Sequence, residues 1–189
     1  MDNQRLVQTA QALVAKGKGI LAADESSGTI KRRFDTINVE STEENRRNYR
    51  EMLFRTAGVD EFLSGVILFD ETIRQEAADG TPMVKVLSDQ GIIPGIKVDK
   101  GTIPLPEAPD ELVTEGLDGL RDRLKEYNEL GAGFTKWRAV ISISNETPTS
   151  YGLATNAHSL ARFAALSQEA GLVPIVEPEV LRDGAHDID

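Results

Sequence analysis

The sequence contains no cysteine and only two histidines, His158 and His186. Without cysteine there is no disulfide framework, no thiol nucleophile and no cysteine-ligated zinc. Two histidines give a weak basis for a metal site, and neither is assigned a role, because His158 lies in a predicted helix and His186 in a terminal loop. We therefore expect chemistry that uses neither a metal ion nor another cofactor.

Long apolar stretches are also missing. No run approaches the roughly 20 residues that cross a bilayer, and the first five residues lack the basic and then apolar order of a secretory signal. The composition, 40% hydrophobic and 28% charged over 189 residues, is that of an ordinary globular protein. We expect a cytoplasmic protein that does not bind membranes.

Positive charge is scarce. The sequence has 21 Lys and Arg residues against 31 Asp and Glu residues, which gives a net charge of −10 and a pI near 4.8. Such a surface repels a phosphodiester backbone, and no basic run with interleaved aromatic residues offers a local exception. Nucleic acid is therefore not an expected partner. A small anionic ligand remains open, because the charge inside a cleft can oppose that of the whole protein.

Apolar runs of strand length alternate with apolar patterns of helical spacing along the whole chain. The predicted strands are residues 20–23, 65–69, 92–99, 134–141 and 173–179. Most intervals hold one helix, and Ser41-Thr42-Glu43-Glu44 predicts a helix start with a capping box. This βα alternation predicts parallel strands with right-handed crossovers, in either a doubly wound sheet or part of a barrel. Since no interior linker interrupts it, we expect one domain, residues 1–189.

Ionisable residues two positions apart mark the last three predicted strands. The pairs are Lys97 with Asp99, Lys136 with Arg138 and Glu177 with Glu179, and Asp24 ends the first strand. Residues two apart share a face of a strand, and both faces of a parallel sheet are usually covered. Because unpaired buried charges are costly, we interpret these residues as a functional cluster at the carboxyl ends of the strands, where barrel active sites form.

Each charge taken alone has a plainer explanation. A carboxylate after a strand, such as Asp24, often caps the next helix, and Lys97 or Lys136 alone could extend along apolar surface to the solvent. The segment 24–29 carries small hydroxyl residues beside Arg33 and fits either a phosphate cradle or a simple helix cap. Arg46 lies near a helix start, where the dipole disfavours cations, so a ligand anion or solvent would have to offset that cost.

Six sequence motifs relate the predicted charged cluster to one known family of proteins. They are Gly17-Lys18-Gly19-Ile20-Leu21-Ala22-Ala23-Asp24-Glu25-Ser26, Glu43-Glu44-Asn45-Arg46-Arg47, Gly65-Val66-Ile67-Leu68-Phe69, Gly95-Ile96-Lys97-Val98-Asp99-Lys100-Gly101, Lys136-Trp137-Arg138 and Val173-Pro174-Ile175-Val176-Glu177-Pro178-Glu179. In content and order they resemble the class I fructose-bisphosphate aldolases. That resemblance implies a (β/α)8 (TIM) barrel, here incomplete, with strands one to five and their helices.

The resemblance also implies roles for nine residues in the reversible cleavage of fructose 1,6-bisphosphate, a step of glycolysis and gluconeogenesis. Glu177 would be the general acid/base of Schiff-base formation, with Lys136 and Glu179 as charged neighbours, and Asp24 would handle the proton of the C4 hydroxyl. Lys97 and Arg138 would contact substrate oxygens. Ser26, Arg33 and Arg46 would serve the phosphate region. The parent protein would be a homo-tetramer.

One departure from the family pattern changes the expected activity. The family forms its Schiff base on a lysine of strand six, and the present sequence stops at Asp189, before that strand. A complete barrel needs about 250 residues, so we expect a fragment that is inactive alone. Three alternatives remain: a noncatalytic fragment or interaction module, a transaldolase-like Schiff-base barrel, and a metal-dependent aldolase. The Lys-Trp-Arg and Glu-Pro-Glu motifs argue against the second, and the scarcity of histidine against the third.

Overall fold

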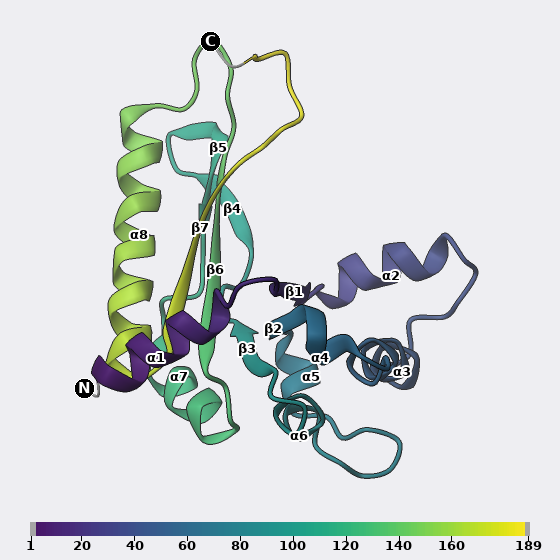
Figure 1. The fold of residues 1–189 in the computed structure, drawn as a ribbon. Helices are drawn as coiled ribbons and strands as arrows, with labels where there is room; N and C mark the ends of the chain where they lie inside the picture. The colour runs from purple at the N-terminus through teal and green to yellow at the C-terminus, as the bar shows by residue number, and fades with distance from the viewer. Residues whose placement is uncertain (1–2, 188–189) are drawn as a thin grey trace.

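Five parallel strands organise the chain (Figure 1). The computed structural model describes residues 3–187. The strands are β1 (Gly19–Ala23), β2 (Leu63–Leu68), β3 (Ile93–Lys97), β6 (Phe134–Ile141) and β7 (Val173–Val180), in the spatial order β1-β2-β3-β6-β7. The five predicted strands are thus confirmed, in chain order, as neighbours in one sheet.

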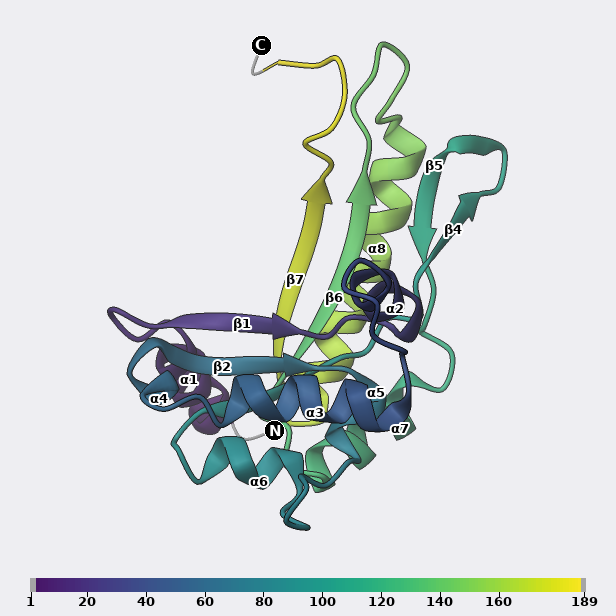
Figure 2. The same cartoon turned by 90° about the vertical axis from the view of Figure 1, so that its right-hand side faces the viewer.

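The sheet is curled rather than flat. Figure 2 shows β1 and β2 running across the view while β6 and β7 run up it. The right-handed twist between adjacent strands accumulates into such curvature, and all four neighbouring pairs are parallel. The sheet is part of a (β/α)8 barrel, as expected, with a concave face that would be the barrel interior and a convex face covered by helices.

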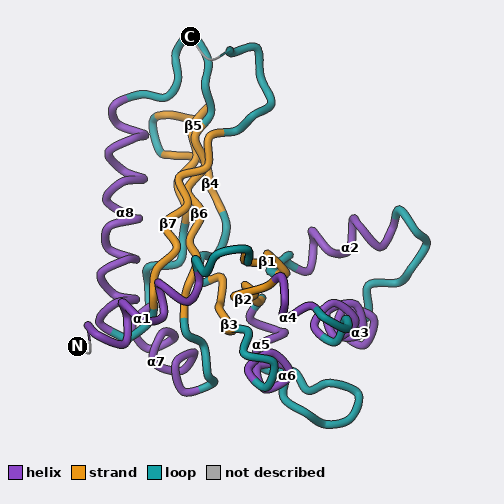
Figure 3. Tube along the Cα trace, in the orientation of Figure 1, coloured by secondary structure: helices purple, strands orange, loops and turns teal. Residues whose placement is uncertain are grey.

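Helices pack around the sheet. They are α1 (Asn3–Leu13), α2 (Ser27–Asp35), α3 (Glu43–Phe54), α4 (Val59–Phe62), α5 (Asp70–Ile73), α6 (Met83–Ser88), α7 (Leu120–Glu129) and α8 (Ser150–Glu169). Most of them cover the convex face of the sheet, and α1 closes the amino end of the concave face. The long α8 lies along β6 and β7 (Figure 3), where Phe163 stacks on Trp137 at 5.5 Å between ring centroids. Both rings belong to the main hydrophobic core. Within residues 3–187, none of the helices has the length and apolarity needed to cross a bilayer.

The amino end of the concave face is closed by α1. Leu13, Ile67 and Phe134 form a small core there. Gly95 makes room for the Phe134 ring, since a Cβ atom on Gly95 would lie 2.3 Å from it, well inside van der Waals contact. This end is therefore packed, and the polar side chains of the concave face lie toward the carboxyl ends of the strands.

Two sequence predictions need correction, and one element was not predicted. The third strand ends at Lys97 instead of Asp99, because the chain turns there and Asp99 Oδ1 accepts a hydrogen bond from the Gly101 amide at 3.2 Å. The proline-rich stretch that follows is an antiparallel hairpin, β4 (Thr102–Leu105) and β5 (Ala108–Thr114), which the sequence analysis missed. Finally, the residue that caps α3 is Thr42, whose side chain accepts a hydrogen bond from the Asn45 amide at 3.1 Å.

Candidate active site

Lys136 is the centre of the charged cluster on the concave face. Its Nζ lies 3.2 Å from Glu177 Oε1 and 3.5 Å from Asp24 Oδ2. The side chains of Lys136 and Asp24 are only 10% and 12% exposed, and that of Glu177 is 36% exposed. Asp24 follows β1, which is separated from β6 by two strands in the sheet. Only the curl of the sheet can bring these groups together.

Strand alternation explains why β6 presents two cations to the concave face. Lys136 and Arg138 point to this face, while Trp137 between them is fully buried in the convex core, as the sequence predicts. Arg138 forms an ion pair with Glu179 on β7, and its register partner is Glu177. Lys136–Glu177 and Arg138–Glu179 are therefore successive charge pairs along the β6–β7 ladder.

Lys97 holds the backbone at Asp24. Its Nζ donates a hydrogen bond to the Asp24 carbonyl oxygen at 2.8 Å and lies 5.2 Å from the centroid of the Phe69 ring, within the range of a cation–π contact. The structure thus brings together Asp24, which follows β1, with Lys97 on β3, Lys136 on β6 and Glu177 on β7. It places Arg138 and Glu179 beside them.

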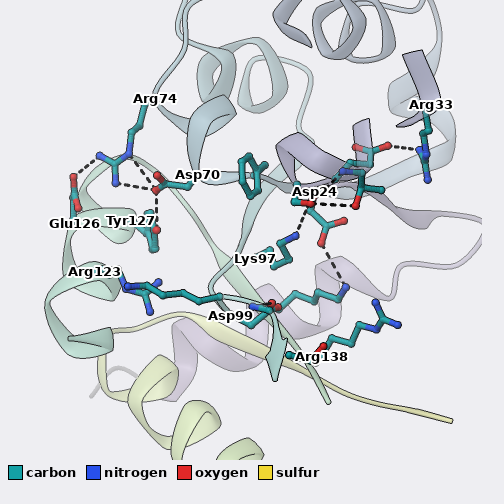
Figure 4. A pocket seen from close by; sticks show the side chains of 18 residues that line it. Asp24, Arg33, Asp70, Arg74, Lys97, Asp99, Arg123, Glu126, Tyr127 and Arg138 are labelled. Atoms are coloured by element: carbon teal, nitrogen blue, oxygen red, sulfur yellow. Dashed lines mark hydrogen bonds and ion pairs between the residues drawn. The ribbon is translucent and has the colours of Figure 1, made fainter. Parts of the chain in front are cut away.

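A cleft of about 850 Å³ opens in front of this cluster (Figure 4). Seven cationic side chains line it against five carboxylates, the reverse of the balance in the whole chain. The cations are Arg33, Arg74, Lys97, Lys100, Arg123, Lys136 and Arg138, and the carboxylates are Asp24, Glu25, Asp70, Asp99 and Glu126. The lining therefore favours an anionic ligand. No group of His, Asp and Glu side chains suited to a metal ion occurs among residues 3–187.

The segment predicted as a phosphate cradle forms one wall of the cleft. Ser26 caps α2, where its Oγ accepts a hydrogen bond from the Thr29 amide at 3.4 Å, so the helix-cap interpretation holds. Both Ser26 and Thr29 also line the cleft. Arg33 forms an ion pair with Glu25, yet its side chain stays 60% exposed. A guanidinium with that exposure is accessible to an anion in the cleft.

Arg46 lies outside the set of residues that line the cleft. Its Nε and Nη2 donate to the two carboxylate oxygens of Glu71 at 2.8 and 2.5 Å, and its Nη1 donates to the Ser41 carbonyl oxygen at 2.6 Å. The hydrogen bond with Glu71 raises the pKa of Arg46. The charge near the start of α3 is therefore compensated by a protein carboxylate, Glu71, whereas the sequence suggested only a ligand anion or solvent.

The far end of the cleft holds a network that the sequence analysis missed. Tyr127 Oη donates to Asp70 Oδ1 at 2.8 Å, and Arg74 Nη2 donates to the same oxygen at 3.0 Å; Arg74 also pairs with Glu126. Burial raises the pKa of Asp70, but the bonds from Arg74 and Tyr127 outweigh it, so the net pKa is lowered. Burial is also the main reason why the pKa of Tyr127 is raised.

Two signals could have found this network. Asp70 comes two residues after β2 ends at Leu68, at the same edge of the sheet as Asp24. Tyr127 shares one face of α7 with Arg123, another residue of the cleft, four positions before it. Neither Asp70 nor Tyr127 lies on a predicted strand, where the charged pairs were sought.

Comparisons with known proteins place the chain in a family. The family model "Glycolytic: Fructose-bisphosphate aldolase class-I" matches residues 5–189. A probable fructose-bisphosphate aldolase class 1 of Xanthomonas campestris is 60% identical over 189 residues, which are 100% of this chain and 57% of the relative. The cytosolic fructose-bisphosphate aldolase 6 of Arabidopsis thaliana is 56% identical over 97% of this chain and 51% of its own.

A solved structure has the same fold. The fructose-bisphosphate aldolase of Plasmodium falciparum, in a ternary co-crystal with TRAP and a small-molecule inhibitor, superposes with a TM-score of 0.96 at 53% identity, over 98% of this chain and 54% of that one. The present chain spans about half the length of the relatives it matches. The resemblance drawn from the six motifs is confirmed: this chain belongs to the class I fructose-bisphosphate aldolase family.

Proposed function

We propose that this chain supplies the first five βα units of a Schiff-base aldolase that reversibly cleaves fructose 1,6-bisphosphate to dihydroxyacetone phosphate and glyceraldehyde 3-phosphate. The observation that carries the proposal is the position of Lys136 Nζ, between the carboxylates of Asp24 and Glu177. Family membership and a cleft whose lining is net positive support it, since the substrate carries two phosphates.

The contacts of Glu177 and Asp24 suit different roles for these two carboxylates in proton transfer. Glu177 does not itself line the cleft, but its carboxylate contacts Lys136, which does, and its side chain is 36% exposed; it serves as the general acid/base of carbinolamine formation and dehydration. Asp24, nearly buried and with a fixed backbone, takes the C4 hydroxyl proton as the C3–C4 bond breaks. Glu179 keeps Arg138 in place beside them. Positioned groups of this kind contribute about 10²- to 10⁴-fold each to a rate.

The remaining cations bind the substrate. Lys97 and Arg138 contact its oxygens, and Ser26 and Arg33, both lining the cleft, contact a phosphate. Arg46 must leave Glu71 before it can reach a phosphate, because both of its carboxylate-facing nitrogens are occupied. We therefore place Arg46 last among the substrate-binding residues.

We further propose that the 189-residue chain does not catalyse the cleavage alone. Covalent catalysis needs an amine with a free electron pair that reaches the substrate ketone carbon. Lys136 Nζ is held between two carboxylates, and Lys97 Nζ is engaged by the Asp24 carbonyl and the Phe69 ring. Misplacement of a reacting group by about 1 Å can cost roughly a hundredfold.

Borohydride trapping tests both proposals. The purified chain and the full-length Xanthomonas campestris relative are each incubated with dihydroxyacetone phosphate and borohydride, and the reduced adduct is located by peptide mass mapping. We expect a stoichiometric adduct on the relative and none on the chain. A stoichiometric adduct on Lys136 or Lys97 of the chain would overturn the assignment of their roles.

Three further properties of the parent protein are proposed on the same basis. Residues 1–189 are one portion of a single barrel domain, the parent is a homo-tetramer, and it is cytoplasmic, in line with the name of the Arabidopsis relative, which calls that protein cytosolic. Light scattering of the restored full-length protein, in which the chain continues to the length of its relatives, tests the tetramer. A monomer or dimer would contradict it.

A further inference from the structure

Arg50, on α3, is a charged side chain with no solvent exposure. Removing a guanidinium from water costs several kcal/mol unless other groups replace the lost hydration. Burial accordingly lowers the pKa of Arg50, while Glu25 and Glu71 raise it. The groups that the buried guanidinium contacts therefore indicate its role.

The guanidinium bridges two carbonyl groups on either side of Asp24. Arg50 Nε donates to the Ala23 carbonyl oxygen at 3.2 Å, and Arg50 Nη2 donates to the Glu25 carbonyl oxygen at 2.7 Å. The Phe69 ring lies 5.8 Å from the guanidinium carbon. Glu25 and Glu71 contribute carboxylate oxygens at 3.8 and 3.7 Å, which balance the charge without direct hydrogen bonds.

The two hydrogen bonds from Arg50 occur where the hydrogen bonding between β1 and β2 ends. The pairing of β1 with β2 ends at Ala23, so the carbonyl groups that follow need other donors. The Asp24 carbonyl receives its hydrogen bond from Lys97, and the carbonyls before and after it receive theirs from Arg50. Three successive carbonyl groups are thereby fixed by side chains from two different elements.

We propose that Arg50 is a positioning residue for the reaction: by holding the backbone on both sides of Asp24, it keeps the Asp24 carboxylate beside Lys136. The inference rests on the proposed function, since it assigns Arg50 to the same proton-transfer centre. Arg50 itself does not line the cleft and touches no substrate. Its loss should therefore act on turnover through Asp24 rather than on substrate binding.

A double-mutant cycle in the restored full-length protein tests this. Arg50→Lys keeps a buried cation but cannot hold both carbonyl groups with a rigid fork of donors. We expect it to lower kcat by about 10- to 100-fold with KM within about twofold, as a small misplacement of a catalytic group would. Combined with Asp24→Asn, it should add little to the loss caused by Asp24→Asn alone, because both changes disable the same group.

Arg47→Lys is the matched control, because Arg47 is on the same helix and donates only to the neighbouring Asn48 in the hydrogen bonds of its side chain. It should leave kcat unchanged. Two outcomes would overturn the inference. One is a loss of kcat in the double mutant equal to the product of the two single losses, and the other is a loss of kcat in Arg47→Lys as large as that in Arg50→Lys. If the unsubstituted protein does not cleave fructose 1,6-bisphosphate, the proposed function fails instead.

Folding of the variants is checked by circular dichroism and thermal unfolding. If Arg50→Lys does not fold, Arg50→Gln replaces it in the same cycle, since glutamine keeps an N–H donor without a buried charge. Failure of both variants to fold would assign Arg50 to folding alone and would also overturn its role as a positioning residue.

Discussion

Replacing Lys136 by methionine removes one charge from the centre of the site and little else. Methionine keeps an unbranched apolar stem of similar length, so the packing of β6 between α8 and the concave face is preserved. What is lost is the ammonium group 3.2 Å from Glu177 and 3.5 Å from Asp24. In the restored full-length protein we expect Lys136→Met to lower kcat by orders of magnitude while the fold persists.

The magnitude follows from the contacts. A positioned acid/base group contributes about 10²- to 10⁴-fold, which corresponds to roughly 3–5 kcal/mol of transition-state stabilisation. The cost in folding should stay below the roughly 3–5 kcal/mol of a broken, fully buried ion pair, because Glu177 is 36% exposed and Asp24 borders a cleft that water can enter. Lys136→Met should therefore lower transition-state stabilisation much more than the free energy of unfolding.

The assay couples triose phosphate release to an NADH-dependent reductase, with circular dichroism and the thermal midpoint as measures of folding. Lys31→Met is the control: Lys31 forms an exposed pair with Asp35, four residues along α2, and such pairs contribute about 0.3–0.5 kcal/mol. It should leave kcat unchanged. A folded Lys136→Met protein with near-normal turnover would refute the assignment of Lys136.

Three further predictions concern stability and association. The isolated chain should associate at micromolar concentration, because β1 and β7 end the described sheet with unpaired edges, which invite pairing with other chains; a monomer with cooperative unfolding in light scattering and denaturant titration would contradict this. Gly95→Ala should lower the thermal midpoint of the restored full-length protein, since its Cβ would overlap the Phe134 ring and overpacking costs about 1–3 kcal/mol. A Cβ atom on Gly28 would meet open space, so Gly28→Ala should not lower that midpoint. Equal midpoints for the two variants would refute the predicted overlap at Gly95. Asp70 has a lowered pKa, so its contribution to stability is present above the pKa of the unfolded chain and is lost as the pH falls through the folded value. The thermal midpoint of Asp70→Asn should lie below that of wild type at pH 7, and this difference should narrow as the pH is lowered below the ordinary carboxyl pKa; a difference that does not narrow would contradict the argument.

The sequence by itself determined the strands and the faces on which their charges lie. Backbone geometry sets a repeat of two residues in any strand, so Lys136 and Arg138 had to share a face with Trp137 on the other. The strand order follows from short right-handed crossovers, and six motifs sufficed to identify the family. These features depend on residues that are close in sequence, which is why they could be predicted without coordinates.

Only the tertiary structure decided which charges meet. Asp24 and Lys136 are 112 positions apart and come into contact because the sheet curls across two intervening strands. The same long-range packing gave Arg46 a carboxylate partner, Glu71, away from the cleft, and buried Arg50 against the backbone around Asp24. Pairing of this kind depends on register, curvature and the approach of separate helices, which local periodicity does not encode.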